Sequence, residues 1–397
     1  SILGTVYVHP FLRADSTMLR ELFCSGIVVS LVSKYSAATQ EPNFGPAVTE
    51  LSLKYTKKFS KDGFVNSILI NSQTFYKMML LTYFLTTGES RREIETFSGL
   101  SVDYNEVLEQ FKVLDKQNIT GVDDGYRVYY DSKYKLNDIS EQVLGDHVSA
   151  IKFSDGNATQ QITDWAETVT KGKIATLGFI KIKKNTTMVL VGVTSMTLKF
   201  KSKYEGQKTL FQKFLRLFNM TTYRKMIKLT GPYEYRDSKE LNCDILKIPY
   251  ENDRLFLVIF LPHKSSNLTM LIKSLDYTNI NSELKKMVKK NGTLFIPEFR
   301  TNNVMSLERR LSLWSLPITL SVKAEFGAFT NSSGLRLNKI ITAEDLDINN
   351  YWTTASSATS SSAQNVTYES SFLHMVYDIT TESPLEMGTY VDEEEFY

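Results

Sequence analysis

The most specific arrangement of side chains in this chain lies near the N-terminus, at residues 6–11. Tyr7 offers a phenol, His9 an imidazole and Phe11 an aromatic ring, which are three distinct groups for a binding pocket to recognise. Pro10 fixes its own backbone angle and biases His9 toward an extended conformation, so less conformational entropy is lost on binding. These residue types in this order predict a ligand for a receptor.

Residues 6–11 resemble the centre of the angiotensin peptide hormones, and the matching residues are Val6, Tyr7, Val8, His9, Pro10 and Phe11. The resemblance implies release by an aspartic protease and binding of the freed peptide to a receptor. A segment this close to a chain end is readily cut. The alternative interpretation is an ordinary tail that matches by chance.

The expected cleavage region consists of Phe11, Leu12 and Arg13. Aspartic proteases bind an extended segment and favour apolar side chains on both sides of the cut bond. The charge of Arg13 would have to be desolvated in an apolar pocket, which is costly. We therefore expect the cut to follow Phe11 or Leu12.

The composition predicts an ordinary globular protein. The chain has 397 residues, of which 42% are hydrophobic and 23% are charged, and its formal net charge is +2. This length is ample for a sizeable core. The longest apolar runs, such as residues 255–261, are far too short to span a bilayer. We expect no membrane or nucleic-acid partner, and we expect that a signal peptide has already been removed.

Two features predict a secreted, extracellular glycoprotein. Acceptor sites for N-glycosylation occur at Asn118, Asn157, Asn185, Asn219, Asn267, Asn291, Asn331 and Asn365. The two cysteines, Cys24 and Cys243, permit one disulfide in an oxidising compartment, which would tether the tail to the body. Two independent, partly buried thiols are the alternative.

Local patterns divide the chain into an extension, residues 1–46, and a body, residues 47–397. Helical periodicity appears at residues 47–59, 72–84, 89–97 and 159–169. Apolar, β-rich runs dominate later, at residues 188–196, 245–249, 254–261 and 294–299. Because helices come first and strands afterwards, without alternation, we predict an α+β fold with largely antiparallel sheets.

Short motifs in a fixed order carry a second resemblance. They are Ile162, Asp164, Trp165, Thr170, Gly172, Lys173 and Ile174, then Leu190, Val191, Lys199, Phe200 and Tyr204, then Leu294, Pro297 and Phe299, and finally Thr381, Ser383, Pro384, Leu385 and Met387. From about residue 47 to its end the chain resembles the serpin family. The resemblance implies a serpin fold with three β-sheets, about eight or nine helices and an exposed reactive-centre loop. It implies neither an enzyme nor a cofactor.

An inhibitory serpin inserts its cleaved loop into a sheet, which requires small side chains, a flexible hinge and a polar shutter beneath that sheet. The loop here spans residues 350–365 and is shorter than in the family's inhibitors. Its assigned residues are Trp352, Thr353, Thr354, Ala355, Ser356, Ser357 and Ala358. The small side chains suit insertion. At the hinge, however, Trp352 stands where the family's inhibitors carry Gly, and Trp lacks the backbone freedom of Gly.

The shutter departs from the family pattern as well. Asn71 and Ser72 stand in place of Ser-Pro, Gly192 in place of an Asn, and Thr342 in place of a His. We therefore predict a non-inhibitory serpin. The leading hypothesis is a hormone precursor with a cleavable tail. The alternatives are a serpin inhibitor of serine proteases with an incidental tail, and a non-inhibitory carrier or scaffold.

Other chemistry is only weakly indicated. The histidines, His9, His147, His263 and His374, show no metal-type spacing and no nucleophile pattern. We expect surface or packed side chains there, and no metal. The basic runs 181–184 and 285–290 offer a surface for sulfated polysaccharide, although a solvated helix face or turn is the commoner role.

Overall fold

The computed structural model describes residues 43–60, 67–178, 180–201, 203–204, 210–215, 221–263, 267–348, 365–367 and 370–391. The chain divides into two compact units, Ser1–Asn43 and Phe44–Tyr397, and the fold below is that of the second. Residues 6–11, Cys24 and the assigned loop residues lie outside the described residues. Among the helices that are described, none is long and apolar enough to cross a membrane.

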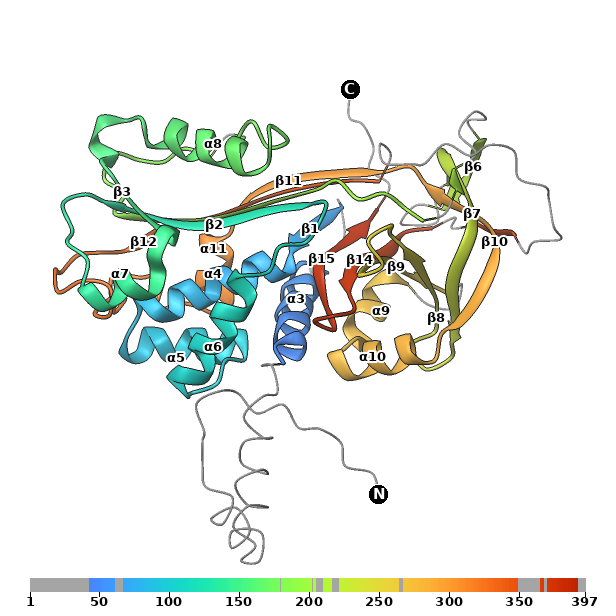
Figure 1. Cartoon of the computed structure of the whole chain (residues 1–397), viewed down its shortest axis with the longest axis horizontal. Coiled ribbons are helices and arrows are strands. Elements are labelled where there is room, and N and C mark those ends of the chain that lie inside the picture. The colour runs from blue at the N-terminus through green and yellow to red at the C-terminus, as the bar shows by residue number, and fades with distance from the viewer. Residues whose placement is uncertain are drawn as a thin grey trace, which may run out of the picture. The chain divides into compact units, whose positions relative to one another are not determined.

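A five-stranded sheet has the order β11-β12-β4-β2-β3 (Figure 1). Its strands are β2 (Val122–Asp131), β3 (Val148–Ile151), β4 (Met188–Met196), β11 (Arg300–Ser306) and β12 (Leu337–Asp347). β12 and β4 are parallel neighbours, whereas β4 and β2 are antiparallel. Helix α8 (Ala158–Val169) covers one face of this sheet, and α4 (Ser72–Leu85) and α7 (Asp138–Leu144) lie on the other.

A larger sheet has the order β1-β15-β14-β9-β8-β7-β10-β13, with β5 and β6 also paired to β7. Its strands are β1 (Ile68–Asn71), β5 (Lys203–Tyr204), β6 (Leu210–Leu215), β7 (Thr221–Ser238), β8 (Cys243–Pro249), β9 (Leu255–Pro262), β10 (Val288–Pro297), β13 (Asn365–Thr367), β14 (Phe372–Asp378) and β15 (Ser383–Tyr390). The long strand β7 pairs with β6 at its start and with β8 at its end. Hydrogen bonds therefore connect the described strands into two sheets, where the resemblance implied three.

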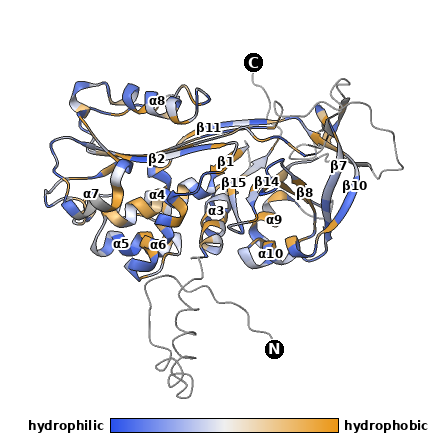
Figure 2. Ribbon diagram, viewed as in Figure 1, coloured by the Kyte–Doolittle hydropathy of each residue, from blue (hydrophilic) through white to orange (hydrophobic). Residues whose placement is uncertain are grey.

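Helix α4 is the centre of the core. It begins because the side-chain oxygen of Asn71 accepts the backbone N–H of Thr74 at 2.8 Å and caps the helix. All of its residues are buried, and it is largely apolar around its circumference (Figure 2), as expected for a helix that is surrounded by protein. The other helices are α3 (Gly45–Ser60), α5 (Gly88–Ser98), α6 (Tyr104–Asp115), α9 (Leu268–Ser274), α10 (Tyr277–Lys285) and α11 (Glu308–Trp314).

Most element predictions are confirmed. The four helical patterns correspond to α3, α4, α5 and α8, and the run 188–196 is β4. The sheets are largely antiparallel. The prediction for residues 294–299 is wrong in its bounds, because β10 begins at Val288 and ends at Pro297. The charged start of β10 is stabilised in the sheet by its cross-strand partners, since Lys289 lies opposite Glu234 of β7.

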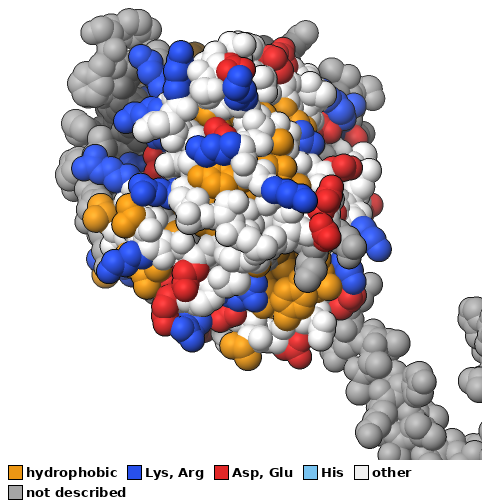
Figure 3. Space-filling view, turned by 90° about the vertical axis from the view of Figure 1, so that its left-hand side faces the viewer, with side chains coloured by type: hydrophobic (Ala, Val, Ile, Leu, Met, Phe, Trp, Pro, Cys, Tyr) orange, Lys and Arg blue, Asp and Glu red, His pale blue; other side chains and the backbone are white. Residues whose placement is uncertain are grey.

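The surface carries both signs of charge. On the face at the left-hand side of Figure 1, basic and acidic side chains are interspersed with small apolar areas (Figure 3). Because both signs are mixed over this face, a polyanion would have to bind at a local run of basic residues.

Candidate functional site

The candidate functional site is the place where the reactive loop would enter the five-stranded sheet. β12 ends at Asp347, shortly before the loop residues, which are not described. β12 and β4 pair in parallel, from Leu337 opposite Met188 to Leu346 opposite Met196. A strand that returned from the end of β12 would run antiparallel to both. Insertion would therefore have to separate this ladder.

Gly192 lies in the middle of β4, opposite Thr342 of β12. A Cβ atom at Gly192 would overlap Sδ of Met78 and lie 3.0 Å from Cγ2 of Thr74, both on α4. The helix therefore packs directly against the backbone of the strand. An Asn side chain, which the family resemblance implies for this position in inhibitors, would fit here only if the side chain of Met78 moved.

Three shutter side chains are buried without a complete set of hydrogen bonds. The amide nitrogen of Asn71 has no partner among the described residues. The hydroxyls of Ser72 and Thr342 are also buried without a described partner. Each buried polar group left in this state costs about 1–3 kcal/mol. The described shutter residues do not form a closed polar network.

Two buried glutamates, which sequence analysis missed, lie next to the shutter. Glu344 of β12 is 1% exposed and Glu386 of β15 is 0% exposed. None of their carboxyl oxygens has a hydrogen-bond partner among the described residues. Glu386 lies opposite Asn71 in the pairing of β15 with β1. Glu344 follows Thr342 by two positions, so both point to the same face of β12.

Burial sets the protonation of both glutamates. It raises the pKa of Glu344 to about 8. The Thr342 hydroxyl and the Asn71 backbone N–H lie close enough to oppose this rise more weakly, but their geometry does not meet the criteria of a hydrogen bond. Burial raises the pKa of Glu386 well above its usual range, and the charge of Glu344 adds to that shift. Both side chains are therefore mainly neutral acids at pH 7. Both glutamates lie in strands that also carry other polar residues, so the local sequence offered no distinct signal for them.

His374 of β14 is the third buried titratable group here. It is 0% exposed, and neither ring nitrogen has a partner in the described part of the chain. Its ring lies against Gly388 of β15, where an added Cβ would come within 2.9 Å of the imidazole. Burial lowers the pKa of His374 to about 3. The prediction of a packed histidine is confirmed at this position.

Comparisons with known proteins identify the family. Residues 46–393 match the family model for serpins, described as serine protease inhibitors. The chain is 25% identical to antichymotrypsin-2 of Bombyx mori over 273 residues, which cover 66% of this chain and 72% of that protein. The chain belongs to the serpin family.

Solved structures agree with this fold. Uncleaved ovalbumin superposes with a TM-score of 0.77 at 16% identity, covering 88% of this chain and 100% of ovalbumin. Human thyroxine-binding globulin in complex with thyroxine superposes with a TM-score of 0.80 at 19% identity, covering 89% of this chain and 99% of the globulin. The predicted serpin fold is confirmed. Serpin inhibitors are not catalytic enzymes.

The acceptor asparagines whose side chains are described lie on the surface. The exposed ones are Asn118, Asn157, Asn185, Asn267, Asn291 and Asn331. Asn219 lies outside the described residues, and only the backbone of Asn365 is described, as the first residue of β13. Attachment of glycans stays a prediction.

Cys243, the first residue of β8, is fully buried. Burial raises the pKa of its thiol to about 12, and the charge of Asp244 adds to that shift. Its partner in the expected disulfide, Cys24, lies outside the described residues, so the pairing stays a prediction. Such a bond would require the tail to reach into the core.

The two basic runs differ in their contacts. Lys181, Lys183 and Lys184 are exposed in the connection between α8 and β4. In the second run Lys286 pairs with Glu283 at 2.8 Å, and Lys290 lies 4.1 Å from the ring centre of Tyr235. The first run is the better candidate for a sulfated polysaccharide, because its charges project into solvent.

Proposed function

We propose that this serpin is a secreted peptide-hormone precursor of the angiotensinogen type. In this proposal the aspartic protease renin cuts the N-terminal tail and frees an angiotensin-like peptide that binds a receptor. The observation that carries the proposal is the run Val6, Tyr7, Val8, His9, Pro10 and Phe11. That run lies in the first of the two units, Ser1–Asn43, and the buried core residues of the described body begin at Phe44. A cut after residue 11 or 12 would remove none of them.

The shutter supports a non-inhibitory body. Insertion would separate β4 from β12, between Gly192 and Thr342. Met78 packs against Gly192, and the carboxyl of Glu344 beneath the ladder lacks partners among the described residues. Opening the ladder would change the surroundings of Met78 and of the Glu344 carboxyl. The described shutter residues form no polar network that could then form hydrogen bonds with the inserted strand. A hormone precursor does not need this movement.

Two departures from the hormone pattern shape the proposal. Gly4 and Thr5 occupy the positions where angiotensins usually carry Asp-Arg or Asn-Arg, and Phe11 is followed by Leu12 and Arg13 in place of His-Leu. The proposed peptide therefore has a different N-terminal end from the usual hormone. The proposed cut follows Phe11 or Leu12, since both side chains are apolar.

The test is digestion of the whole protein with renin, followed by mass spectrometry of the released peptides. We expect a fragment that ends at Phe11 or Leu12 and contains residues 6–11. The substitution Phe11→Ala should slow release, while Phe23→Ala, an aromatic change elsewhere in the extension, should not. If no fragment containing residues 7–11 appears, the hormone-precursor proposal fails.

The name of the silkworm relative, antichymotrypsin-2, favours the inhibitor as the second candidate. An inhibitory serpin forms a covalent complex with its target protease that survives SDS. We expect no such complex with chymotrypsin or trypsin, because the hinge and shutter are altered. A stable complex with either protease would place the inhibitor first and leave the tail incidental.

A further inference from the structure

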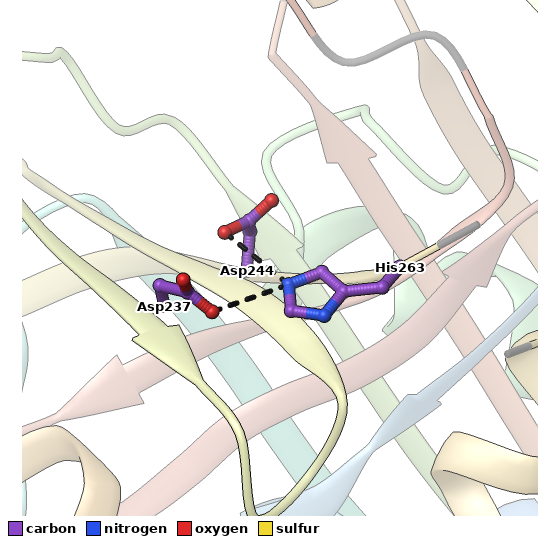
Figure 4. A group of neighbouring side chains, drawn as sticks. All are labelled: Asp237, Asp244 and His263. Atoms are coloured by element: carbon purple, nitrogen blue, oxygen red, sulfur yellow. Dashed lines mark ion pairs between the residues drawn. The ribbon is translucent and has the colours of Figure 1, made fainter. Parts of the chain in front are cut away.

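Three side chains with metal-ligating atoms converge at one end of the larger sheet (Figure 4). Asp237 of β7 and Asp244 of β8 are directly opposite each other in the antiparallel pairing. His263 follows the end of β9. One ligand atom from each lies within 4.8 Å of the others. Like charges directly opposite in a sheet repel, so this pair of carboxylates favours a cation between them.

The distances fit a metal ion better than hydrogen bonds. Nε2 of His263 lies 3.5 Å from Oδ1 of Asp237 and 3.5 Å from Oδ1 of Asp244. N–H···O hydrogen bonds are usually about 2.7–3.2 Å long. Two ligand atoms of a tetrahedral zinc ion, each about 2.0–2.1 Å from the metal, are about 3.4 Å apart. The two nitrogen–oxygen separations of 3.5 Å therefore correspond to two edges of such a tetrahedron, and the two carboxylate oxygens lie within 4.8 Å of each other.

A further residue holds each of the three ligands. Nδ1 of His263 lies 3.1 Å from Oδ1 of Asn242, an oxygen that can only accept, so Nδ1 is engaged there and Nε2 is the ring nitrogen that faces the carboxylates. Lys239 donates to Oδ2 of Asp237 at 2.6 Å, which leaves Oδ1 directed at the histidine. Outer partners of this kind orient the ligands of metal centres.

The phenol of Tyr235 donates to Oδ1 of Asp244 at 2.5 Å, the same oxygen that faces His263, and so orients this carboxylate. The side chains of Asp237, Asp244 and His263 are 42%, 30% and 24% exposed, while Oδ1 of Asp237 is itself buried without a hydrogen-bond partner among the described residues. We propose that Asp237, Asp244 and His263 bind a divalent transition-metal ion of the zinc class, with water as the fourth ligand.

The ligand set selects the class of metal. One imidazole and two carboxylates suit zinc and its neighbours, whereas calcium requires six to eight oxygen ligands. The bound ion would join the hairpin of β7 and β8 to the end of β9, because each of these elements supplies one ligand. This inference does not depend on the hormone-precursor proposal, since it concerns the serpin body alone.

The test is calorimetric titration of the full-length protein with zinc chloride in a buffer that does not chelate metals. We expect one site, with binding lost in His263→Ala and weakened at least about tenfold in Asp237→Asn. Loss of an outer partner in Tyr235→Phe should weaken binding by about 10–100-fold. His147→Ala is the matched control, because His147 pairs with a single carboxylate, Asp115, at 2.8 Å and should not affect binding.

Two outcomes would overturn the assignment. Absence of zinc binding by the native chain would show that Asp237, Asp244 and His263 interact only with one another and with their neighbours in the fold. Unchanged affinity in His263→Ala would place the metal elsewhere, for example at His9. If His263→Ala does not fold, the more exposed Asp237→Asn decides between the same outcomes, with its folding checked by circular dichroism.

Discussion

Asp378 and Glu386 are both fully buried acids on neighbouring strands, but their surroundings differ. Asp378 accepts hydrogen bonds from Nε of Arg254 at 2.9 Å and from Nη2 at 2.6 Å. It also accepts the backbone N–H of Thr380 at 2.9 Å. Glu386 has no such partner among the described residues. The same chemical group is thus part of an ion pair in one place and a mainly neutral acid in the other.

The comparison shows that the fold places its buried acids in two kinds of surroundings. The ion pair of Arg254 and Asp378 joins the start of β9 to the end of β14, and its remaining hydrogen-bonding positions are satisfied locally. The carboxyls near the shutter lie where strands of two sheets meet, and no cation is directed at them among the described residues. We therefore expect the stability of the fold to depend on the ion pair around Asp378 in the first region, and on pH near the shutter, where Glu344 and Glu386 are buried without a cation among the described residues.

The largest expected effect is the loss of the buried ion pair. Arg254→Met should destabilise the protein by about 3–5 kcal/mol, because it leaves the carboxylate of Asp378 buried and without its cation. Urea denaturation measures this change. Arg92→Met removes an exposed pair with Glu89 and should cost less than about 1 kcal/mol. Equal effects of the two substitutions would contradict the comparison.

The second effect concerns the contact of β4 with α4. Gly192→Ala should destabilise the protein by about 1–3 kcal/mol, because the new Cβ would overlap Sδ of Met78. Removing that sulfur with Met78→Ala should make the alanine at 192 less harmful. A double-mutant cycle, measured by urea denaturation, checks this coupling. Simple additivity of the two changes would show that the contact does not constrain the strand.

The third effect is a pH dependence near the shutter. The pKa of Glu344 is raised from 4.5 to about 8, so between these values the folded state holds a proton that the unfolded state has lost. The contribution of Glu344 to stability should therefore be fully present below pH 4.5 and be lost as pH rises toward 8, by up to about 1.4 kcal/mol for each pH unit.

Glu344→Gln should flatten this decline, whereas Glu251→Gln, an exposed control, should not. His374 acts in the opposite direction, since its pKa falls from 6.5 to about 3. Its contribution is present above pH 6.5 and is lost as pH falls toward 3. Thermal melts of the native chain and of the two glutamate variants, measured between pH 4.5 and 8, separate the contribution of Glu344 to stability from that of other groups. An unchanged slope in Glu344→Gln would mean that this residue is already ionised in the fold.

The smallest expected effect follows a cut in the reactive loop. Cleavage between Thr353 and Asn365 should leave the melting temperature nearly unchanged, because Trp352 and the altered shutter oppose insertion. The measurement is a thermal melt before and after limited proteolysis. A large rise in melting temperature would show that the ladder between β4 and β12 does open.

Local sequence determined most of the secondary structure. The run of apolar residues from Met188 to Met196 identified β4 with both of its bounds, and Asn71 capped α4 at the residue where its pattern begins. Such signals are local, because side-chain periodicity and capping depend on residues a few positions apart. The serpin motifs then supplied the family, and the run from Val6 to Phe11 supplied the functional hypothesis without any contribution from the fold.

Tertiary structure alone decided which distant residues meet. Glu344, Glu386 and Asn71 come from three separate strands, and the proposed metal ligands come from two strands and the end of a third. The sequence showed no metal-type spacing because His263 reaches the aspartates through strand pairing rather than through nearby positions. A strand's period specifies which side chains share a face, but the partner across that face is chosen by packing of the whole chain.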